Sequence, residues 1–488
     1  MAFILGVFGN NLFFIANYEY FYPLVSTLVS SWPLSVLYTA FPLYLNDYPY
    51  ISLDVFINSY LLFFFMEKVQ RTVISAAMIG TILEWYGIFL FSSGAVYIGA
   101  AFLPKTNALT AIASVLFVFA IGFFMRPVGA VVFGHYGDKI GRKRMLILTL
   151  IISGLSTGFV GVLPTYAQSG VSAIILLIIL RLLLGFGLGG EWGGAMLLTL
   201  ENFKKKRGLW GSFVQSTVGI GLILGAVAFL ILTSILPSSA MYAWGWRIPY
   251  LLAFFVLVIG VFIRLRIPET PIFEAAKKEK EIQKYPISGL FKQHKLNLLL
   301  STLIVASSGT IYYVGITLIP SLYEVENIVT VHFAQIAIIG FGLAEILFVF
   351  IGGIISDKVG RRVMAIVANL VFIVIVFPSI FLRGAGLLII FLLLYGVSHG
   401  IGYTSEGDII SEIFPTNVRY TGNSFAYQFA NAYVAGPAPY ASLALGAISE
   451  FLYPVYGLIF SVLAIGSALK IKETKDVDLE GEKNRNDK

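Results

Sequence analysis

The chain has 488 residues, of which 58% are hydrophobic and 12% are charged, and its formal net charge is +7. Soluble domains carry about 25% charged residues, so this composition excludes an ordinary soluble protein and favours an integral membrane protein. Because the chain has no cysteine, disulfide bonds and thiolate metal sites are also excluded.

Residues 1–65 form an atypical apolar N-terminal extension that contains no Lys or Arg and is interrupted by Pro23, Pro33 and Pro42. A secretory signal is excluded, since it would need a positively charged start. Two interpretations remain open: the working chain starts at Met66, or the extension adds one or two membrane segments. We favour a start at Met66, where MEKVQR supplies a basic lead into the first span.

Twelve apolar segments follow, each of the length that crosses a bilayer as a helix. They lie at approximately 73–103, 109–134, 145–163, 171–200, 208–236, 247–266, 295–322, 331–355, 363–382, 385–411, 419–446 and 449–469. The loops on one side hold nearly all the Lys and Arg, whereas the other side holds only Lys105, Arg247 and Arg383. By the positive-inside rule, both ends of the twelve-span core are expected in the cytoplasm, in a multi-pass protein of the cell (plasma) membrane.

Two loops repeat one pattern. GHYGDKIGRKRM (134–145) and GGIISDKVGRRVM (352–364) share G-x-x-x-D-K-x-G-R-[KR], and each follows the second span of a six-span half. Parallel duplication of six-helix halves is a transporter architecture that holds its substrate at the midplane. An Asp in a short basic loop can pair charges and cap a helix start, so we interpret both loops as gating latches rather than as ordinary basic loops. The gating residues are Gly134, Asp138, Gly141, Arg142, Lys143, Asp357, Gly360, Arg361 and Arg362.

The predicted fold class is therefore an all-α integral membrane protein with twelve transmembrane helices in two six-helix halves. After the extension 1–65, the expected parts are an N-terminal half at 66–266, a cytoplasmic linker at 267–294, a C-terminal half at 295–470 and a cytoplasmic tail at 471–488. The tail is short and highly charged, so we expect it to be disordered.

The stretch RLLLGFGLGGEWGGAM (181–196) contains G-x-G-x-x-G, the letters of a dinucleotide-binding turn. Such a turn must follow a strand and open a helix, but these residues lie inside one continuous apolar run. Gly185, Gly189 and Gly193 instead recur every four residues, which allows another membrane helix to approach closely.

Six stretches then carry a specific resemblance: GTILEWYGIFLF (80–91), GFFMRPVGAVVFGHYGDKIGRKRM (122–145), RLLLGFGLGGEWGGA (181–195), WGWRIPYLLAF (244–254), PETPIFE (268–274) and SEIFPTNVRYTGNSFAYQFANA (411–432). The chain resembles major facilitator superfamily transporters, and among them the metabolite:proton symporters of the shikimate, proline–betaine and alpha-ketoglutarate type. The resemblance implies a secondary transporter that works by alternating access and takes up a small organic acid or zwitterionic metabolite with protons. It further implies a monomer in the lipid bilayer that binds no cofactor and no nucleic acid.

Other functions remain as alternatives. A uniporter or an efflux carrier has the same fold. A membrane-embedded enzyme needs a metal cluster or a nucleophile with its base, and four scattered histidines without cysteine favour neither, so we predict no catalytic residue and no metal site. The function of a channel or a receptor would not explain why the latch loop occurs twice.

Ionisable residues inside spans are costly and are functional candidates by default. This sequence has Glu84, Arg126, Arg181, Glu191, Glu345, Glu406 and Asp408 at such positions. In related carriers an Arg at the position of Arg181 pairs with an acid of the first span, where the usual pattern is E-W-[FY]-D. Here Gly87 replaces the second acid, so we expect Glu84, on the same helical face, to pair with Arg181 and take the proton. The alternatives are a static structural pair and a loss of coupling.

The candidate site is completed by Arg126, Glu191, Glu406, Asp408, Tyr312 and Tyr313. Arg126 is expected either to bind a substrate carboxylate bidentately or to pair with Glu191. Glu406 and Asp408 depart from the usual pattern of the resembling family, and one of them is a candidate for binding a proton or a cationic substrate group. Tyr312 and Tyr313 are candidates for the wall of the binding cavity, with a lipid-facing belt as the alternative.

Overall fold

The computed structural model describes residues 68–103, 108–203, 205–267, 269 and 286–479, and within these ranges the chain is helical and contains no strand. The N-terminal extension, with the predicted start at Met66, lies outside the described residues. Most of the linker also lies outside the described residues. Of the linker, the structure describes Ile267, Glu269 and the segment from Pro286 onward.

Helices of the first half begin after the extension and end before the linker. They are α5 (Lys68–Ser93), α6 (Ala95–Phe102), α7 (Ala108–Ile140), α8 (Arg142–Val160), α9 (Tyr166–Ser169), α10 (Val171–Asn202), α11 (Arg207–Gln215), α12 (Thr217–Ile235), α13 (Ser238–Ala240), η1 (Met241–Gly245) and α14 (Arg247–Leu265).

Helices of the second half follow the same plan. They are α16 (Pro286–Gln293), α17 (Lys295–Tyr313), η2 (Val314–Leu318), α18 (Ile319–Val325), α19 (Val331–Val359), α20 (Arg361–Phe381), α21 (Ala385–Glu412), α22 (Arg419–Ala430), η3 (Asn431–Ala435), α23 (Ala438–Gly446), η4 (Glu450–Leu452) and α24 (Val455–Lys470).

The membrane spans correspond to those that the hydropathy pattern predicts. Among the described residues, 10 helical segments are long and apolar enough to cross a membrane. The 33-residue helix α7 and the segment formed by α22, η3 and α23 complete the twelve spans. That last segment is polar in its first part, and it breaks at Gly436 and Pro437, because proline cannot donate the backbone hydrogen bond that a continuous helix needs.

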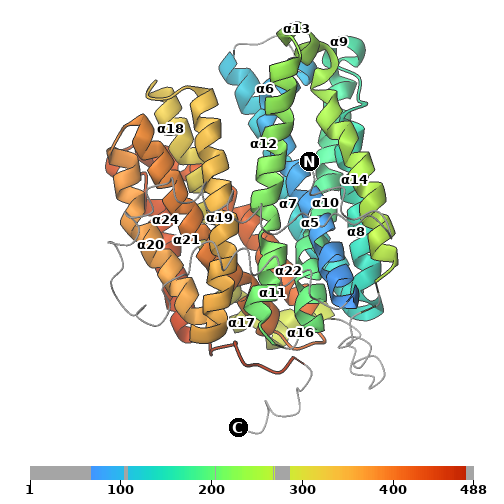
Figure 1. Cartoon of the computed structure of the whole chain (residues 1–488), viewed down its shortest axis with the longest axis vertical. Helices are drawn as coiled ribbons and strands as arrows, with labels where there is room; N and C mark the ends of the chain where they lie inside the picture. The colour runs from blue at the N-terminus through green and yellow to red at the C-terminus, as the bar shows by residue number, and fades with distance from the viewer. Residues whose placement is uncertain (1–67, 104–107, 204, 268, 270–285, 480–488) are drawn as a thin grey trace, which may run out of the picture. The chain divides into compact units, whose positions relative to one another are not determined.

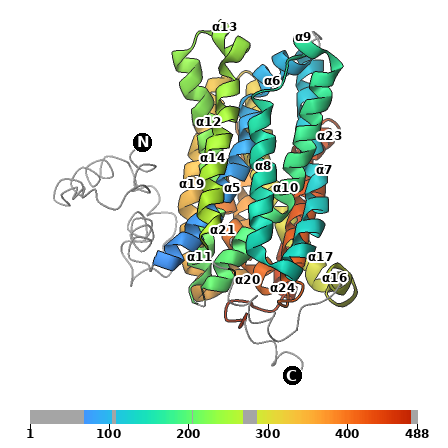
Figure 2. The same ribbon diagram turned by 90° about the vertical axis from the view of Figure 1, so that its right-hand side faces the viewer.

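The halves stand side by side and touch through a small set of helices (Figures 1 and 2). Helices α7 and α10 pack against α22, while α11 and α12 pack against α19, and α11 also contacts α21. Large apolar side chains such as Ile175, Ile179 and Leu183 are exposed on α10, as expected for a surface in contact with lipid. The charged side chains of the spans are buried inside, so each needs a partner or a function.

Glycines bring α7 and α10 into close contact, as the four-residue spacing predicts. A methyl group added at Gly185 would lie 1.8 Å from the carbonyl oxygen of Gly122, and one at Gly189 would lie 2.4 Å from that of Arg126. Gly193 faces Ser424 of α22 in the other half. Since the close neighbours of Gly185 are backbone atoms, which cannot rotate away, this helix contact requires glycine.

Gly185→Ala is therefore expected to separate α7 from α10 and lower the melting temperature by about 5 °C or more. The matched control is Gly466→Ala on α24, where an added methyl group meets nothing within 4 Å and should raise helix stability slightly. Intrinsic tryptophan fluorescence during heating of the purified protein measures both effects. Equal melting temperatures for the two variants would contradict the packing assignment.

Candidate functional site

One buried ion pair holds the first half together. Glu191 of α10 binds the guanidinium of Arg264 on α14 and accepts a hydrogen bond of 2.6 Å from Thr149 of α8. Both charged side chains are fully buried. The predicted alternative pairing of Glu191 with Arg126 is therefore not formed. The sequence analysis does not single out Arg264, which lies two residues before the end of its predicted span at 247–266.

Glu84 of α5 and Arg126 of α7 are buried as well, but their polar atoms are not fully paired. Both are buried, with 1% of each residue exposed. Neither carboxylate oxygen of Glu84 has a hydrogen-bond partner among the described residues, and the same holds for Nε and Nη1 of Arg126. Glu84 interacts electrostatically with Arg126, Glu191 and Arg264. Because Glu191 and Arg264 already bind one another, Arg126 is the opposite charge that remains available to Glu84.

Arg181 does not form the predicted ion pair with Glu84. Its guanidinium carbon lies 4.2 Å from the centre of the Phe91 ring, and the group interacts electrostatically with Tyr250 and Arg126. Gly87 faces α8, where an added methyl group would lie 2.6 Å from the Thr157 hydroxyl. The helical spacing correctly places Arg181 against α5, but at Phe91 rather than at Glu84.

The three acids of the second half occupy different environments. Glu345 of α19 lies 2.6 Å from Nδ1 of His399 on α21. Asp408 lies 3.5 Å from Nε of Arg361, so it belongs to the charged network of the latch described below. Glu406, two residues earlier, points instead toward the centre of the molecule, where it lines a cavity. Glu406 and Asp408 therefore do not share one site.

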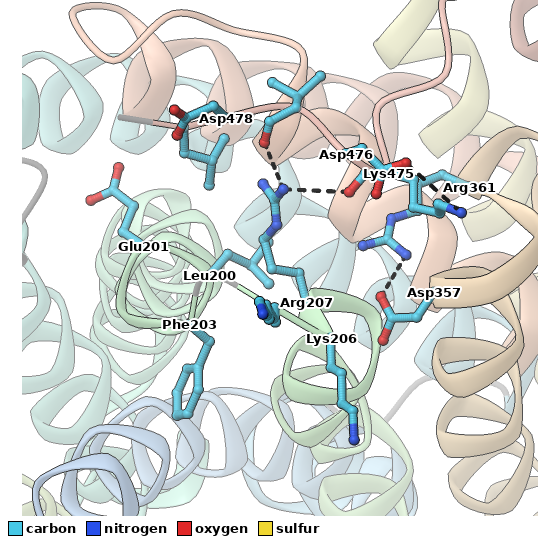
Figure 3. Close-up of a pocket in the computed structure, with 13 residues that line it drawn as sticks. Leu200, Glu201, Phe203, Lys206, Arg207, Asp357, Arg361, Lys475, Asp476 and Asp478 are labelled. Carbon is cyan, nitrogen blue, oxygen red and sulfur yellow. Dashed lines mark hydrogen bonds and ion pairs between the residues drawn. The ribbon is translucent and has the colours of Figure 1, made fainter. Parts of the chain in front are cut away.

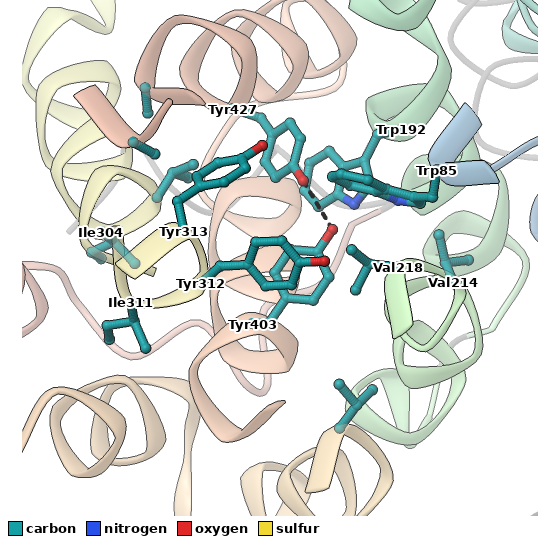
Figure 4. Packing of buried hydrophobic residues seen from close by; sticks show 14 of the residues in the cluster. Trp85, Trp192, Val214, Val218, Ile304, Ile311, Tyr312, Tyr313, Tyr403 and Tyr427 are labelled. Atoms are coloured by element: carbon teal, nitrogen blue, oxygen red, sulfur yellow. Dashed lines mark hydrogen bonds between the residues drawn. The ribbon is translucent and has the colours of Figure 1, made fainter. Parts of the chain in front are cut away.

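Aromatic side chains from both halves meet at this cavity. Tyr312 and Tyr313 of α17 are 3% and 7% exposed, which excludes the lipid-facing alternative. Tyr403 and Tyr427 lie beside them, their hydroxyl oxygens 2.9 Å apart. Figure 4 shows these tyrosines facing Trp85 and Trp192 of the first half. The cavity has room for about one water molecule, so the two halves are closed around it.

The predicted latches each cap a helix of the opposite half. Asp138, at the end of α7, accepts hydrogen bonds from the backbone amides of Tyr420 and Thr421, at 3.1 and 2.9 Å. These amides belong to the first turn of α22 and have no partner within that helix. The carboxylate therefore satisfies them and also meets the positive end of the helix dipole.

The second loop repeats this contact in the opposite direction. Asp357, at the end of α19, accepts hydrogen bonds from the amides of Gly208 and Leu209, at 2.9 and 3.0 Å. These amides open α11, in the first half. Within each loop the Asp also lies near the Arg four residues later, at 3.6 Å for Arg142 and 2.8 Å for Arg361.

Other predicted gating residues support the loop geometry. Gly141 and Gly360 adopt φ angles of 116° and 104°, which favour glycine over residues with a side chain. Gly134 lies against Thr421, where an added methyl group would come within 2.8 Å of Cα. Lys143 donates to the carbonyl of Leu265 at the end of α14, and Arg362 donates to Ala468 and Leu469 at the end of α24.

Two glutamates outside the spans extend the symmetry and were missed by the sequence analysis. Glu269 accepts from the amides of Arg142 and Lys143, and Glu473 accepts from those of Arg361 and Arg362. The signal that reveals them is a second repeat, RIPET at 266–270 and KIKET at 470–474. Burial alone raises a carboxyl pKa, but backbone amide donors hold the pKa of Glu473 below its ordinary value.

Buried charges connect the two latches. Glu201 lies 3.3 Å from Arg142 and 3.2 Å from Arg419, and Glu412 lies 3.4 Å from both Arg207 and Arg361. Each acid lies on the fourth membrane span of its half, Glu201 on α10 and Glu412 on α21. Each one bridges an arginine of the first half and an arginine of the second. The network therefore joins the halves at one end of the bundle, which we call the latch end.

The beginning of the tail packs against the latch end, so the prediction of disorder is wrong for residues 471–479. Arg207 donates to the carbonyls of Lys475 and Val477, the latter at 2.6 Å, and Leu479 is buried. Figure 3 shows these contacts beside Arg361 and Asp357. The arginine at the start of α11 holds the segment by its backbone, which explains why the charged side chains of the tail do not prevent packing.

The chain matches the Major Facilitator Superfamily over residues 24–439. It is 35% identical over 416 residues to an inner membrane metabolite transport protein of Escherichia coli strain K12, YhjE, and the match covers 81% of this chain and 94% of that protein. The chain belongs to the Major Facilitator Superfamily. It is thus a multi-pass membrane transporter and not an enzyme.

Two further similarities place it within the superfamily. The chain is 28% identical to OusA of Dickeya dadantii strain 3937, a glycine betaine/proline/ectoine/pipecolic acid transporter, with 84% of this chain and 85% of that protein covered. Its fold matches the proton:xylose symporter XylE, in a structure with bound 6-bromo-6-deoxy-D-glucose, at a TM-score of 0.71 and 17% identity, covering 84% and 98% of the chains.

Within the ranges that the structure describes, no group of three or more His, Asp or Glu side chains suits a metal ion.

Replacing both latch acids, Asp138→Asn with Asp357→Asn, is expected to open the latch end. Charge-assisted hydrogen bonds contribute about 1.5–3 kcal/mol each, enough to shift a two-state population about tenfold or more. The natural chain has no cysteine, so Met196→Cys, at a fully buried position between the halves, serves as a reporter. The rate of its alkylation should rise about tenfold in the double variant.

The matched control for the latch is Asp476→Asn, an acid of the tail whose side chain is largely exposed and pairs with Lys475. It should leave the alkylation rate of Met196→Cys unchanged. A double latch variant that is alkylated at the control rate would show that the two caps do not hold this end closed.

Proposed function

We propose that this transporter takes up a small organic acid or zwitterionic metabolite together with protons, by alternating access. In this proposal Glu84 binds the proton and Arg126 binds the substrate carboxylate. The latch end faces the cytoplasm, since the loops that form it carry most of the Lys and Arg. Relatives that transport metabolites and glycine betaine or proline support the substrate class.

One observation carries the proposal: Glu84 and Arg126 are opposite charges, buried near each other, with hydrogen-bonding atoms that have no partner among the described residues. An isolated buried charge is strongly unfavourable, so both groups are stabilised by whatever binds between them. A substrate carboxylate satisfies the fork of donors on Arg126. It then competes with Glu84 for the same positive charge, which favours protonation of Glu84 when substrate is bound.

This competition gives the coupling a direction. Substrate and proton each lower the cost of binding the other, and the reciprocity follows from linkage. The loaded centre carries a neutral Glu84 and an Arg126 paired with the substrate. The empty centre holds an ionised Glu84 near Arg126, so that the two charges balance. In both states the charges of Glu84, Arg126 and any bound ligand sum to zero. A centre that holds only the proton or only the substrate carboxylate carries a net charge. The halves exchange between conformations in the two balanced states.

The test compares Glu84→Gln with the natural protein in proteoliposomes, using labelled proline and labelled glycine betaine as probes. Gln imitates the protonated carboxyl group, so exchange of internal for external probe should persist. Accumulation driven by a pH gradient should fall at least about tenfold, to the equilibrium level. Glu326→Gln is the matched control, because Glu326 forms an exposed pair with Arg383 outside the centre.

Two outcomes contradict the proposal in different ways. Full accumulation by Glu84→Gln would place the proton site elsewhere. Exchange without any response to the pH gradient in the natural protein would identify a uniporter, in agreement with the absence of an acid at Gly87.

A further inference from the structure

The aromatic cavity at the centre contains a carboxylate without a positive partner. It is lined by Glu406 together with Trp85, Tyr312, Tyr313, Tyr403 and Tyr427. Glu406 is 1% exposed, and its Oε2 has no hydrogen-bond partner in the described part of the chain. No lysine or arginine of that part forms an ion pair with it or acts on it electrostatically.

Glu345, Asp408 and Glu412 also have oxygens without a hydrogen-bond partner among the described residues, but each of them lies beside an arginine or a histidine. Glu345 is bound to His399, Glu412 lies within ion-pair distance of Arg207 and Arg361, and Asp408 lies 3.5 Å from Arg361. His399 also lines the cavity, but its Nδ1 faces Glu345 rather than Glu406. Within the described residues, Glu406 therefore pairs with neither an arginine nor a histidine and interacts only with uncharged side chains such as that of Ser308, which leaves room for a positively charged ligand group.

The walls around Glu406 suit a positively charged nitrogen. Aromatic ring faces attract cations, and the attraction reaches about 2 kcal/mol or more where water is excluded. Figure 4 shows tyrosine rings from α17, α21 and α22 on one side and Trp85 on the other. The Tyr312 hydroxyl and the Trp85 indole nitrogen are also buried, with no hydrogen-bond partner in the part of the chain that the structure describes, so polar groups of a ligand find partners on both sides.

We propose that this cavity binds the ammonium group of the substrate, so that the transported molecule carries a positively charged nitrogen as well as a carboxylate. The proposal rests on the proposed function, in which Arg126 binds the carboxylate. The geometry joins the two sites: Phe123, whose ring lies 4.3 Å from the guanidinium carbon of Arg126, packs edge-on against Tyr313 of the cavity wall.

The cavity also lies between the halves. Trp85 and Val218 come from the first half, and Tyr312, Tyr403 and Glu406 come from the second. Since the closed cavity has room for about one water molecule, an ammonium group must separate these walls in order to enter. Binding of the cation is thereby linked to movement of one half against the other.

The test uses two pairs of probes that match in shape and differ in charge. Glycine betaine is compared with 3,3-dimethylbutanoate, in which carbon replaces the charged nitrogen, and proline is compared with cyclopentanecarboxylate. Binding to the purified full-length protein is measured by tryptophan fluorescence and by calorimetry. At least one member with the positive nitrogen (the charged member) should bind about tenfold or more tightly than its counterpart in which carbon makes that position uncharged (the neutral member), although both keep the carboxylate.

Variants then assign the preference to this cavity. Glu406→Gln should remove most of the preference for the charged member. Tyr312→Leu should weaken binding of the charged member, whereas Tyr312→Phe, which keeps the ring face, should retain it. Melting temperatures show whether each variant is folded, and the preference of the natural protein tests the proposal even where a variant fails to fold.

Equal binding of charged and neutral members, or no binding of either charged member, would overturn the proposal. So would a Glu406→Gln variant that keeps the preference but no longer responds to a pH gradient, because Glu406 would then be a proton site. These binding measurements need no pH gradient. A failure of proton coupling therefore appears only in proteoliposomes and remains separate from a failure of the ammonium site.

Discussion

A charge inside a membrane-spanning bundle must be compensated, and this constraint organises the whole transporter. An uncompensated ionised side chain at the centre of a bilayer costs about 2.5–3.5 kcal/mol on insertion scales. Glu191 with Arg264 meets the requirement inside the first half, and in the second half Glu345 lies within hydrogen-bond distance of His399. The acids of the latch end meet it across the halves. Glu84, Arg126 and Glu406 form no ion pair among the described residues and keep buried atoms without hydrogen-bond partners there, and it is at these residues that we place the ligands.

The latch end uses the same physics for a different purpose. Each Asp satisfies backbone amides at the start of a helix in the opposite half, a contact that exists only while the halves are together. Because the two caps are related by the internal repeat, we expect them to form and break as a pair when one half moves against the other. The glutamates after the sixth and twelfth spans hold the loops in place but join no halves.

The sequence predicts those features that depend on local patterns. Span positions follow from hydropathy, the latch residues from an internal repeat, and the close approach of α7 and α10 from glycine spacing. It does not predict which charges meet. The prediction of a Glu84–Arg181 pair is wrong because spacing along a helix fixes the face of a residue but not the direction of a long side chain. The Arg181 guanidinium lies over the Phe91 ring instead. Arg264 and Glu473 were missed because their partners are remote in the chain.

The central claim is that the substrate and a proton bind together because both act on Glu84 and Arg126. The most direct measurement is the number of protons taken up when glycine betaine or proline binds to purified protein in a weakly buffered solution. The account predicts an uptake of about one proton per bound molecule in the pH range where Glu84 is ionised, and none in Glu84→Gln. An uptake in Glu84→Gln equal to that of the natural protein would contradict the account.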